Sequence, residues 1–166
     1  GFFRYVLLRL NSNGTLDSTF GAGGYAITDI AGGAYAVALQ PDGKILVNGS
    51  SGIVRYNTNG SIDTSFAING VFASEIDVSQ DIALQADGKI VAAGGYSGFA
   101  LTRLNPDGSP DTSFGTNGNV ITLIDGSRGS VGNALALQPD GKILSGGSIY
   151  QSSGIADAAI LRYSGE

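Results

Sequence analysis

Short runs of apolar residues recur along the whole chain, and each run ends in a cluster of Gly, Asn, Asp or Ser. Runs of about four to eight residues rich in Val, Ile, Leu and Tyr between such clusters are typical of β-strands. No window shows the period of about 3.6 residues that marks an amphipathic helix. The pattern therefore predicts strands at residues 5–10, 25–30, 34–40, 44–48, 53–56, 71–76, 80–85, 89–93, 99–104, 119–124, 131–138, 142–146 and 158–163.

One peptide, beginning Ala-Leu-Gln and containing Asp-Gly-Lys, occurs three times, at residues 38–46, 83–91 and 136–144. Two copies have Pro at the first turn corner, where it presets φ, and the third has Ala86. The Asp-Gly pair supplies residues that tolerate a positive φ, which a tight reversal needs. Each copy therefore predicts a β-hairpin with apolar arms.

A second peptide starts with Arg, reaches an Asp eight residues later and continues to Phe, at residues 9–21, 55–66 and 103–115. A fourth copy starts at Arg162 and is cut off by the end of the chain. A Gly shortly after each Phe opens a further β-type run, as at Gly24 and Gly70. Each period of roughly 45 to 55 residues thus holds four predicted strands, which we call a, b, c and d.

Four antiparallel strands per period is the pattern of β-propeller blades. We therefore expect an all-β chain of about three four-stranded units, either part of a closed propeller or assembling into one. The expected units are 1–30 (strands c and d), 31–77, 78–125 and 126–166 (strands a, b and c) of a single repeat array. A β-helix uses shorter coils, and an immunoglobulin-like sandwich would not repeat one turn peptide three times.

Composition removes several classes of function. The net charge is −5 without any run of Lys or Arg, which argues against a nucleic-acid partner, and no apolar stretch is long enough for a membrane span. The chain has no His and no Cys, so a Ser-His-Asp triad, a thiolate and the common zinc ligands are missing. We expect no enzyme activity and no cofactor. Because the sequence also lacks Met, we expect it to be a fragment of a longer chain.

The peptides Leu-Gln-Pro-Asp-Gly-Lys-Ile-Leu and Arg-Leu-Asn-Pro-Asp-Gly-Ser-Pro-Asp-Thr-Ser-Phe-Gly resemble the delta-60 type repeats of large bacterial proteins. The resemblance covers nearly the whole chain. It implies a β-propeller in a secreted or cell-surface protein, with no assigned catalytic residue. The sequence departs from the repeat pattern at Ala86, at Ala67 and in an insertion at residues 149–156.

The loop of the second peptide is a candidate calcium site. Asn105, Asp107 and Asp111 place oxygen atoms at spaced positions around a Gly, and calcium binds such oxygens. The spacing does not fit the EF-hand, and two of the three copies have Asn in place of a second carboxylate. Asn and Asp also stabilise turns through their own backbone, which is the favoured interpretation, with calcium as the alternative.

The Arg and the Asp eight residues later can meet across the turn between them. The pairs are Arg9 and Asp17, Arg55 and Asp63, and Arg103 and Asp111. A charge-assisted Arg–carboxylate bond in every blade is the favoured interpretation, and a ring of Arg that binds an anionic ligand is the alternative. We expect the repeated Phe (Phe20, Phe66, Phe114) to fill the core between blades and the repeated Lys (Lys44, Lys89, Lys142) to be solvated.

Aromatic residues outside the repeated peptides are the candidates for ligand binding. Tyr96 and Tyr150 are the predicted binding residues, with Phe99 and the Gly- and Ser-rich segment 147–154 beside them. The expected loop at residues 125–132 also differs between copies. A local site should lie in such parts, because residues that recur in every unit are explained by turns and packing.

The sequence thus favours a non-catalytic binding or scaffold module of a secreted or cell-surface bacterial protein. Its expected partners are protein or glycan, together with other copies of the chain or further repeats of a longer one. The alternative is a propeller enzyme of lyase or hydrolase type whose site is completed by another chain or segment.

Overall fold

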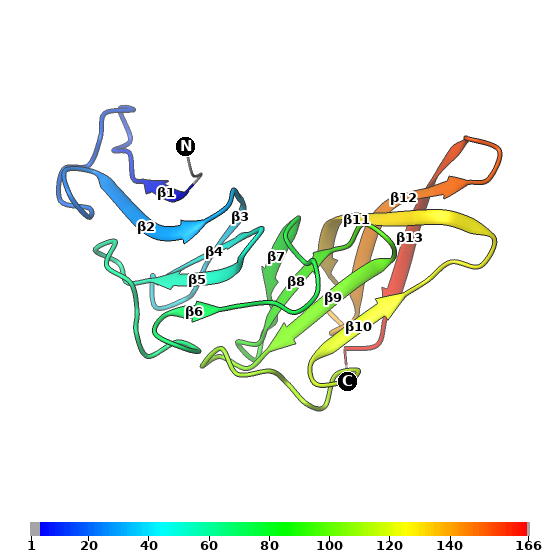
Figure 1. The fold of residues 1–166 in the computed structure, drawn as a ribbon. Helices are drawn as coiled ribbons and strands as arrows, with labels where there is room; N and C mark the ends of the chain where they lie inside the picture. The colour runs from blue at the N-terminus through cyan, green and yellow to red at the C-terminus, as the bar shows by residue number, and fades with distance from the viewer. Residues whose placement is uncertain (1–3, 166) are drawn as a thin grey trace.

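A computed structural model describes residues 4–165, and every regular element in that range is a β-strand (Figure 1). The strands are β1 (Arg4–Leu8), β2 (Tyr25–Ala31), β3 (Ala34–Leu39), β4 (Ile45–Gly49), β5 (Gly52–Tyr56), β6 (Val71–Phe72), β7 (Asp81–Leu84), β8 (Ile90–Gly94), β9 (Phe99–Leu104), β10 (Asn119–Thr122), β11 (Ser127–Leu137), β12 (Ile143–Gln151) and β13 (Ala156–Tyr163).

The strands form four antiparallel sheets, which we number as blades 1 to 4 in chain order. Blade 1 contains β1 and β2, blade 2 contains β3 to β6, blade 3 contains β7 to β10, and blade 4 contains β11 to β13. Within each blade every strand pairs with the next one in sequence, so strands a to d run from one sheet edge to the other. The blades stand side by side in chain order without closing a ring (Figure 1). The predicted all-β propeller class is confirmed.

The Ala-Leu-Gln peptides form the three a–b hairpins. In each hairpin the Gly of Asp-Gly has a φ of 82–84° and donates its N–H to the carbonyl of the Gln three residues earlier. In the first hairpin, Asp42 accepts a bond from the Lys44 N–H, as an Asx turn does. The hairpin with Ala86 makes the same bonds, so the turn does not need its Pro. Only the Gly, and not the Asp, adopts a positive φ.

The core lies between blades rather than within one sheet. Phe20 of blade 1 packs with Ile45 and Val47 of blade 2, and Phe66 of blade 2 packs with Ile82 of blade 3. A third cluster joins blades 3 and 4 around Phe114 and Ile143. The prediction that the repeated Phe residues fill the core between blades is confirmed, since all three are buried.

Two expectations about individual strands were wrong. The run at residues 71–76 forms only the two-residue β6, because the chain leaves the sheet at Ala73 to cross to blade 3. The expected loop at 125–132 belongs mostly to β11, which begins at Ser127 and pairs with the lengthened β12. The insertion at residues 149–156 thus extends the hairpin of β12 and β13.

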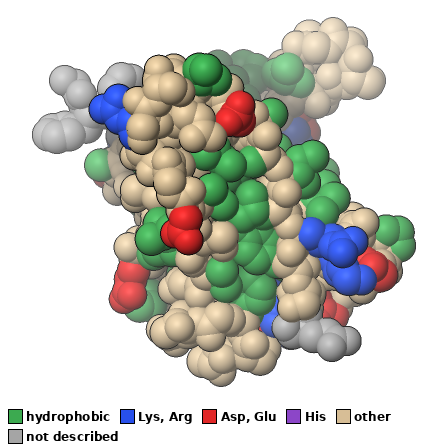
Figure 2. All heavy atoms as spheres, turned by 90° about the vertical axis from the view of Figure 1, so that its right-hand side faces the viewer, with side chains coloured by type: hydrophobic (Ala, Val, Ile, Leu, Met, Phe, Trp, Pro, Cys, Tyr) green, Lys and Arg blue, Asp and Glu red, His purple; other side chains and the backbone are tan. Residues whose placement is uncertain are grey.

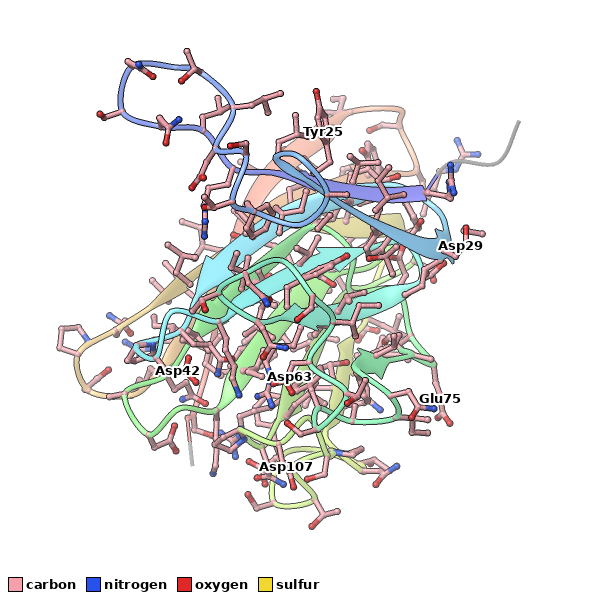
Figure 3. The ribbon with its side chains drawn as sticks, turned by 90° about the vertical axis from the view of Figure 1, so that its left-hand side faces the viewer. Tyr25, Asp29, Asp42, Asp63, Glu75 and Asp107 are labelled. Atoms are coloured by element: carbon pink, nitrogen blue, oxygen red, sulfur yellow. The ribbon has the colours of Figure 1, made fainter. Side chains whose placement is uncertain are left out.

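The alternating strand directions sort the connections into two ends. The a–b hairpins and the Asn-Gly loops between c and d lie at one end, which we call the repeat end. The b–c turns and the d–a connections lie at the other, the variable end. Figure 3 shows this division, with Asp42 on one side and Asp29 and Glu75 on the other.

Both outer faces of the array expose apolar side chains that inner blades bury. On blade 1 the N-terminal face presents Val6, Leu8, Tyr25 and Ile27 to solvent. On blade 4, Ile160 is 77% exposed, whereas the equivalent Ile53 of blade 2 is fully buried. Figure 2, seen from the side of blade 4, shows hydrophobic side chains in a central band of this C-terminal face.

Candidate functional site

The repeated Arg and Asp form one ion pair in each of blades 1 to 3. In blade 3, Nε of Arg103 donates to Oδ2 of Asp111 at 2.7 Å, and the guanidinium lies 4.5 Å from the ring centre of Phe114. Nη2 donates to the Ser113 hydroxyl at 3.2 Å. Arg103 is only 1% exposed, so a buried charge is satisfied by a carboxylate, a hydroxyl and an aromatic face. We call this arrangement the Arg–Asp–Phe lock.

The same lock occurs in the other two copies. The Arg-to-Asp distances are 2.7 Å for Arg9 and Asp17 and 2.8 Å for Arg55 and Asp63. The guanidinium-to-ring distances are 4.7 Å for Phe20 and 4.6 Å for Phe66. Sequence spacing predicted these pairs, and their meeting is confirmed.

Each lock also joins one blade to the next. Nη1 of Arg9 donates to the carbonyl of Thr58 at 2.6 Å, and Nη1 of Arg55 donates to that of Pro106 at 2.6 Å. The third copy, Arg103, reaches the carbonyl of Gly165. Every acceptor lies three residues beyond the Arg of the following repeat. These Arg residues therefore hold blades together, and their donors are directed inward rather than toward an anionic ligand.

The lysines of the hairpins also take part in the locks. Nζ of Lys44 lies 2.9 Å from Oδ2 of Asp63, and Nζ of Lys89 lies 3.1 Å from Oδ2 of Asp111. The expectation that these lysines are only solvated edge charges was therefore wrong for two of the three copies. Lys142 pairs with the neighbouring Asp140 instead.

The locks lower the pKa of their carboxyl groups. Burial alone would raise the pKa of Asp63, but hydrogen bonds from Ser65 and Lys44 and the charge of Arg55 hold it well below its ordinary value. The same balance, with Ser113, Lys89 and Arg103, lowers the pKa of Asp111. Both carboxyl groups are therefore ionised at neutral pH and fully engaged in pairing.

The residues of the candidate calcium site are engaged in two other kinds of contact, the ion pair of the lock and the hydrogen bonds of the turn. Asp111 belongs to the lock, with Oδ2 facing Arg103 and Oδ1 accepting bonds from Ser113. Asp107 is exposed and accepts bonds from the Ser109 N–H at 2.9 Å and the Ser109 hydroxyl at 2.6 Å. Asn105 donates its side-chain amide to Ser109 and to the carbonyl of Pro110. Within residues 4–165, no group of three acidic side chains is arranged to hold a metal ion.

The predicted aromatic residues lie at the variable end but not together. Tyr96 is on the b–c turn of blade 3 and is 70% exposed, and Tyr150 is near the tip of the long hairpin of blade 4. Phe99 is fully buried in β9, so the suggestion that it contacts a ligand was wrong. The tips of the b–c turns are where the repeat pattern is weakest.

One groove at the variable end is lined by tyrosines and acidic residues that the sequence analysis did not predict to lie together. It has a volume of about 330 Å³ and is lined by Tyr35, Glu75, Asp77 and Tyr96, with three serines and Ile76. We call it the tyrosine groove. Tyr35 is the second residue of strand a of blade 2, whereas the two acids lie on the connection from blade 2 to blade 3. The groove therefore lies over the boundary between these blades.

Tyr35, Glu75 and Asp77 were missed because none belongs to a repeated motif. A comparison of the periods does offer a signal, since Tyr35 occupies the position of Gln80 in the next unit and Tyr96 that of Ser51. Departures from the repeat therefore mark the lining of the groove, although the sequence could not show that they converge.

A family of repeat proteins matches most of this pattern. The family described as a β-propeller domain of unknown function (DUF5122) matches residues 1–20, 40–66, 85–114 and 138–165, which contain the Arg–Asp–Phe motifs and most of the hairpins. The chain belongs to this family. The family places it among β-propeller repeats, as expected, whereas the delta-60 name stays an expectation. Comparison with curated proteins gives no significant match.

Two solved structures resemble the chain. A candidate gluconolactonase has a TM-score of 0.51 at 20% identity, over 93% of this chain and 44% of that one. Virginiamycin B lyase from Staphylococcus aureus, solved with selenomethionine, has a TM-score of 0.47 at 14% identity, over 99% of this chain and 47% of that one. The chain thus spans less than half the length of either protein. At these identities the similarity to the gluconolactonase shows the propeller fold alone.

The locks predict a loss of stability in acid. Because the pKa of Asp111 is lowered by folding, its contribution to the free energy of unfolding is present above pH about 4 and is lost as the pH falls further. At pH 7 we expect Asp111→Asn to lower that free energy by about 3–5 kcal/mol, the cost of leaving Arg103 buried without its partner. Urea unfolding at pH 7 and pH 2 should show the gap between wild type and variant closing in acid.

The matched control is Asp29→Asn. Asp29 pairs with Arg4 on the surface, where both side chains are largely exposed, so its loss should cost less than about 1 kcal/mol. Equal losses for the two substitutions at pH 7, or a gap that persists unchanged at pH 2, would contradict the role of the lock.

The calcium site stays a prediction of the sequence, and melting curves test it. Because the oxygens of Asp111 already accept bonds from Arg103 and Ser113, we expect the same melting temperature in calcium and in chelator. A rise with calcium that Asp107→Asn abolishes would show instead that this loop binds the ion and that Asp107 is one of its ligands.

Proposed function

We propose that the chain is a non-catalytic binding module of a secreted or cell-surface protein, and that it binds protein or glycan partners at its variable end. The observation that carries the proposal is the division of side chains between the two ends. The repeated Arg, Asp and Phe are occupied in locks, whereas the exposed Tyr35 and Tyr96 line a groove at the variable end. Exposed aromatic side chains beside polar groups are typical of binding surfaces.

The chemistry of the chain supports binding rather than catalysis. The sequence has no His and no Cys, and the two acids with strongly lowered pKa values, Asp63 and Asp111, are neutralised by Arg and Lys. Structural ion pairs of this kind also shift pKa values, so the lowered pKa values do not indicate catalytic acids or bases. The location outside the cell rests on the resemblance to delta-60 repeat proteins. Among residues 4–165 there is no helix that is long and apolar enough to cross a membrane.

We also propose that a further blade packs against each of the two exposed apolar faces of the array, the N-terminal face and the C-terminal face. The N-terminal face with Val6, Leu8, Tyr25 and Ile27 is the surface that blades 2 and 3 bury against the preceding blade. Exposed apolar patches of this kind mark interaction sites. Another copy of the chain, or further repeats of the same kind, supplies the neighbour.

Association of copies is tested by the mass in solution. We expect the chain to be larger than a monomer at micromolar concentration, and Leu8→Glu to lower the mass because it places a charge in the apolar face. Ile68→Glu, at an exposed site in the c–d loop of blade 2, is the control. A monomer at all concentrations would argue against pairing of copies.

Binding at the variable end is tested with a panel of immobilised oligosaccharides. We expect at least one to bind, and Tyr96→Ala to weaken that binding by about tenfold or more, as the loss of an aromatic contact residue commonly does. Tyr150→Ala shows whether the long hairpin takes part. Ile68→Ala removes an exposed apolar side chain from outside the variable end and should leave binding unchanged. An equal loss in Ile68→Ala would place the binding surface elsewhere.

A further inference from the structure

The tyrosine groove has a chemical character that a neighbouring groove at the variable end does not share. Tyr35 is 60% exposed and Tyr96 is 70% exposed, so both rings are accessible. Glu75 and Asp77 add two carboxylates, and no Lys or Arg lines the groove. Within residues 4–165 neither carboxylate has a basic side chain at ion-pair distance.

The acidic side of the groove is held in place by its own connection. Oδ1 of Asp77 accepts bonds from the N–H and the hydroxyl of Ser79, at 3.2 and 2.8 Å. The adjacent Val78 is buried between blades 2 and 3, and its carbonyl accepts a 2.6 Å bond from the buried Asn48. Because the connection is anchored at this point, its carboxylates need little ordering when a ligand binds.

The Tyr35 ring is positioned by the backbone beneath it. A Cβ atom at Gly33 would lie 2.9 Å from the Tyr35 hydroxyl, so the ring packs closely over a residue without a side chain. The hydroxyl of Ser50 accepts the N–H of Gly33 at 3.1 Å and so holds the residue that directly precedes this strand. The groove thus has an ordered aromatic wall on blade 2 and an acidic connection leading to blade 3.

The neighbouring groove provides the contrast. It has a volume of about 270 Å³, lies between blades 3 and 4, and is lined by residues 123–129 and Ser97. It contains Asp125 together with Arg128 and no aromatic side chain. The two grooves occupy equivalent places in the array, but only the tyrosine groove combines aromatic rings with uncompensated negative charge.

We propose that the tyrosine groove binds a saccharide that carries a protonated amine, such as a glucosamine unit. The apolar face of a sugar ring packs on a Tyr ring, the hydroxyls bind serine side chains, and the ammonium group pairs with Glu75 and Asp77. Aromatic faces also attract the cation. A volume of about 330 Å³ is near the lower limit for ligand sites and suits one or two sugar units. The inference rests on the proposed glycan binding and specifies its ligand.

Calorimetric titration with two trisaccharides tests this inference. The first is the trimer of glucosamine, and the second is the same trimer with every amine acetylated, which removes the charge. We expect the wild-type chain to bind the amine trimer about tenfold more tightly, the effect of one charge-assisted contact. The preference should fall as salt is raised, because the pair is at the surface.

Two variants separate charge from shape. In Glu75→Gln/Asp77→Asn we expect the preference for the amine trimer to disappear while the acetylated trimer binds as before. Asp125→Asn, which removes a charge from the neighbouring groove, should keep the full preference. Glu75 and Asp125 are exposed, whereas Asp77 is half-buried, and Asn at position 77 keeps an oxygen that can accept the bonds from Ser79. Unchanged melting temperatures confirm that both variants fold.

The outcomes distinguish this inference from the proposed function. If the two trimers bind equally, or if the double variant keeps the preference, the inference is overturned while glycan binding stands. If a lysine tripeptide binds as tightly as the amine trimer, the groove recognises ammonium groups in general. The inference that its ligand is a saccharide is then overturned. If no oligosaccharide binds, both the inference and the proposed glycan binding are overturned.

Discussion

The buried guanidinium of the Arg–Asp–Phe lock is the constraint on which the other features depend. A charge in the interior is tolerated only when it is paired and hydrogen-bonded, so Arg103 requires Asp111, Ser113 and Phe114 at fixed positions in the following loop. Its remaining Nη1 donor requires a carbonyl of the next repeat, which fixes the place of the neighbouring blade. One side chain thereby links the turn, the sheet and the spacing between sheets.

The need to pair the buried Arg also explains why the repeat end keeps the same residues in each blade while the variable end does not. The Asn-Gly loops and the Asp-Gly-Lys hairpins are at the end where Lys89 joins Asp111, so a change there disturbs both a turn and a lock. Among residues 4–165 no ion pair joins a b–c turn to a d–a connection. These turns and connections carry residues such as Tyr96 and Glu75, whose side chains are free to differ between blades and to define a binding surface.

The sequence predicted the features that arise from local spacing. The hairpins follow from Asp-Gly, and the meeting of Arg55 with Asp63 follows from eight residues around a turn. It could not predict that Lys44 joins this pair, because Lys44 reaches it from another strand. The tyrosine groove was missed for the same reason, since a strand, a turn and a connection from two blades converge there. β11 begins earlier than expected because it pairs with the long β12. Residues 127–130 lack the apolar pattern of a strand, so the sequence did not predict this pairing.

The reach of each Arg has a consequence for how such a chain can vary in length. Arg9 and Arg55 each bind a carbonyl one period ahead and no farther, so every interface is specified by two adjacent repeats. A gene that gains or loses a whole period therefore keeps all remaining interfaces intact, whereas a change of a few residues within a lock destroys one. Recombination between the DNA segments that encode these similar hairpin peptides can then lengthen the array and bring new variable turns next to old ones.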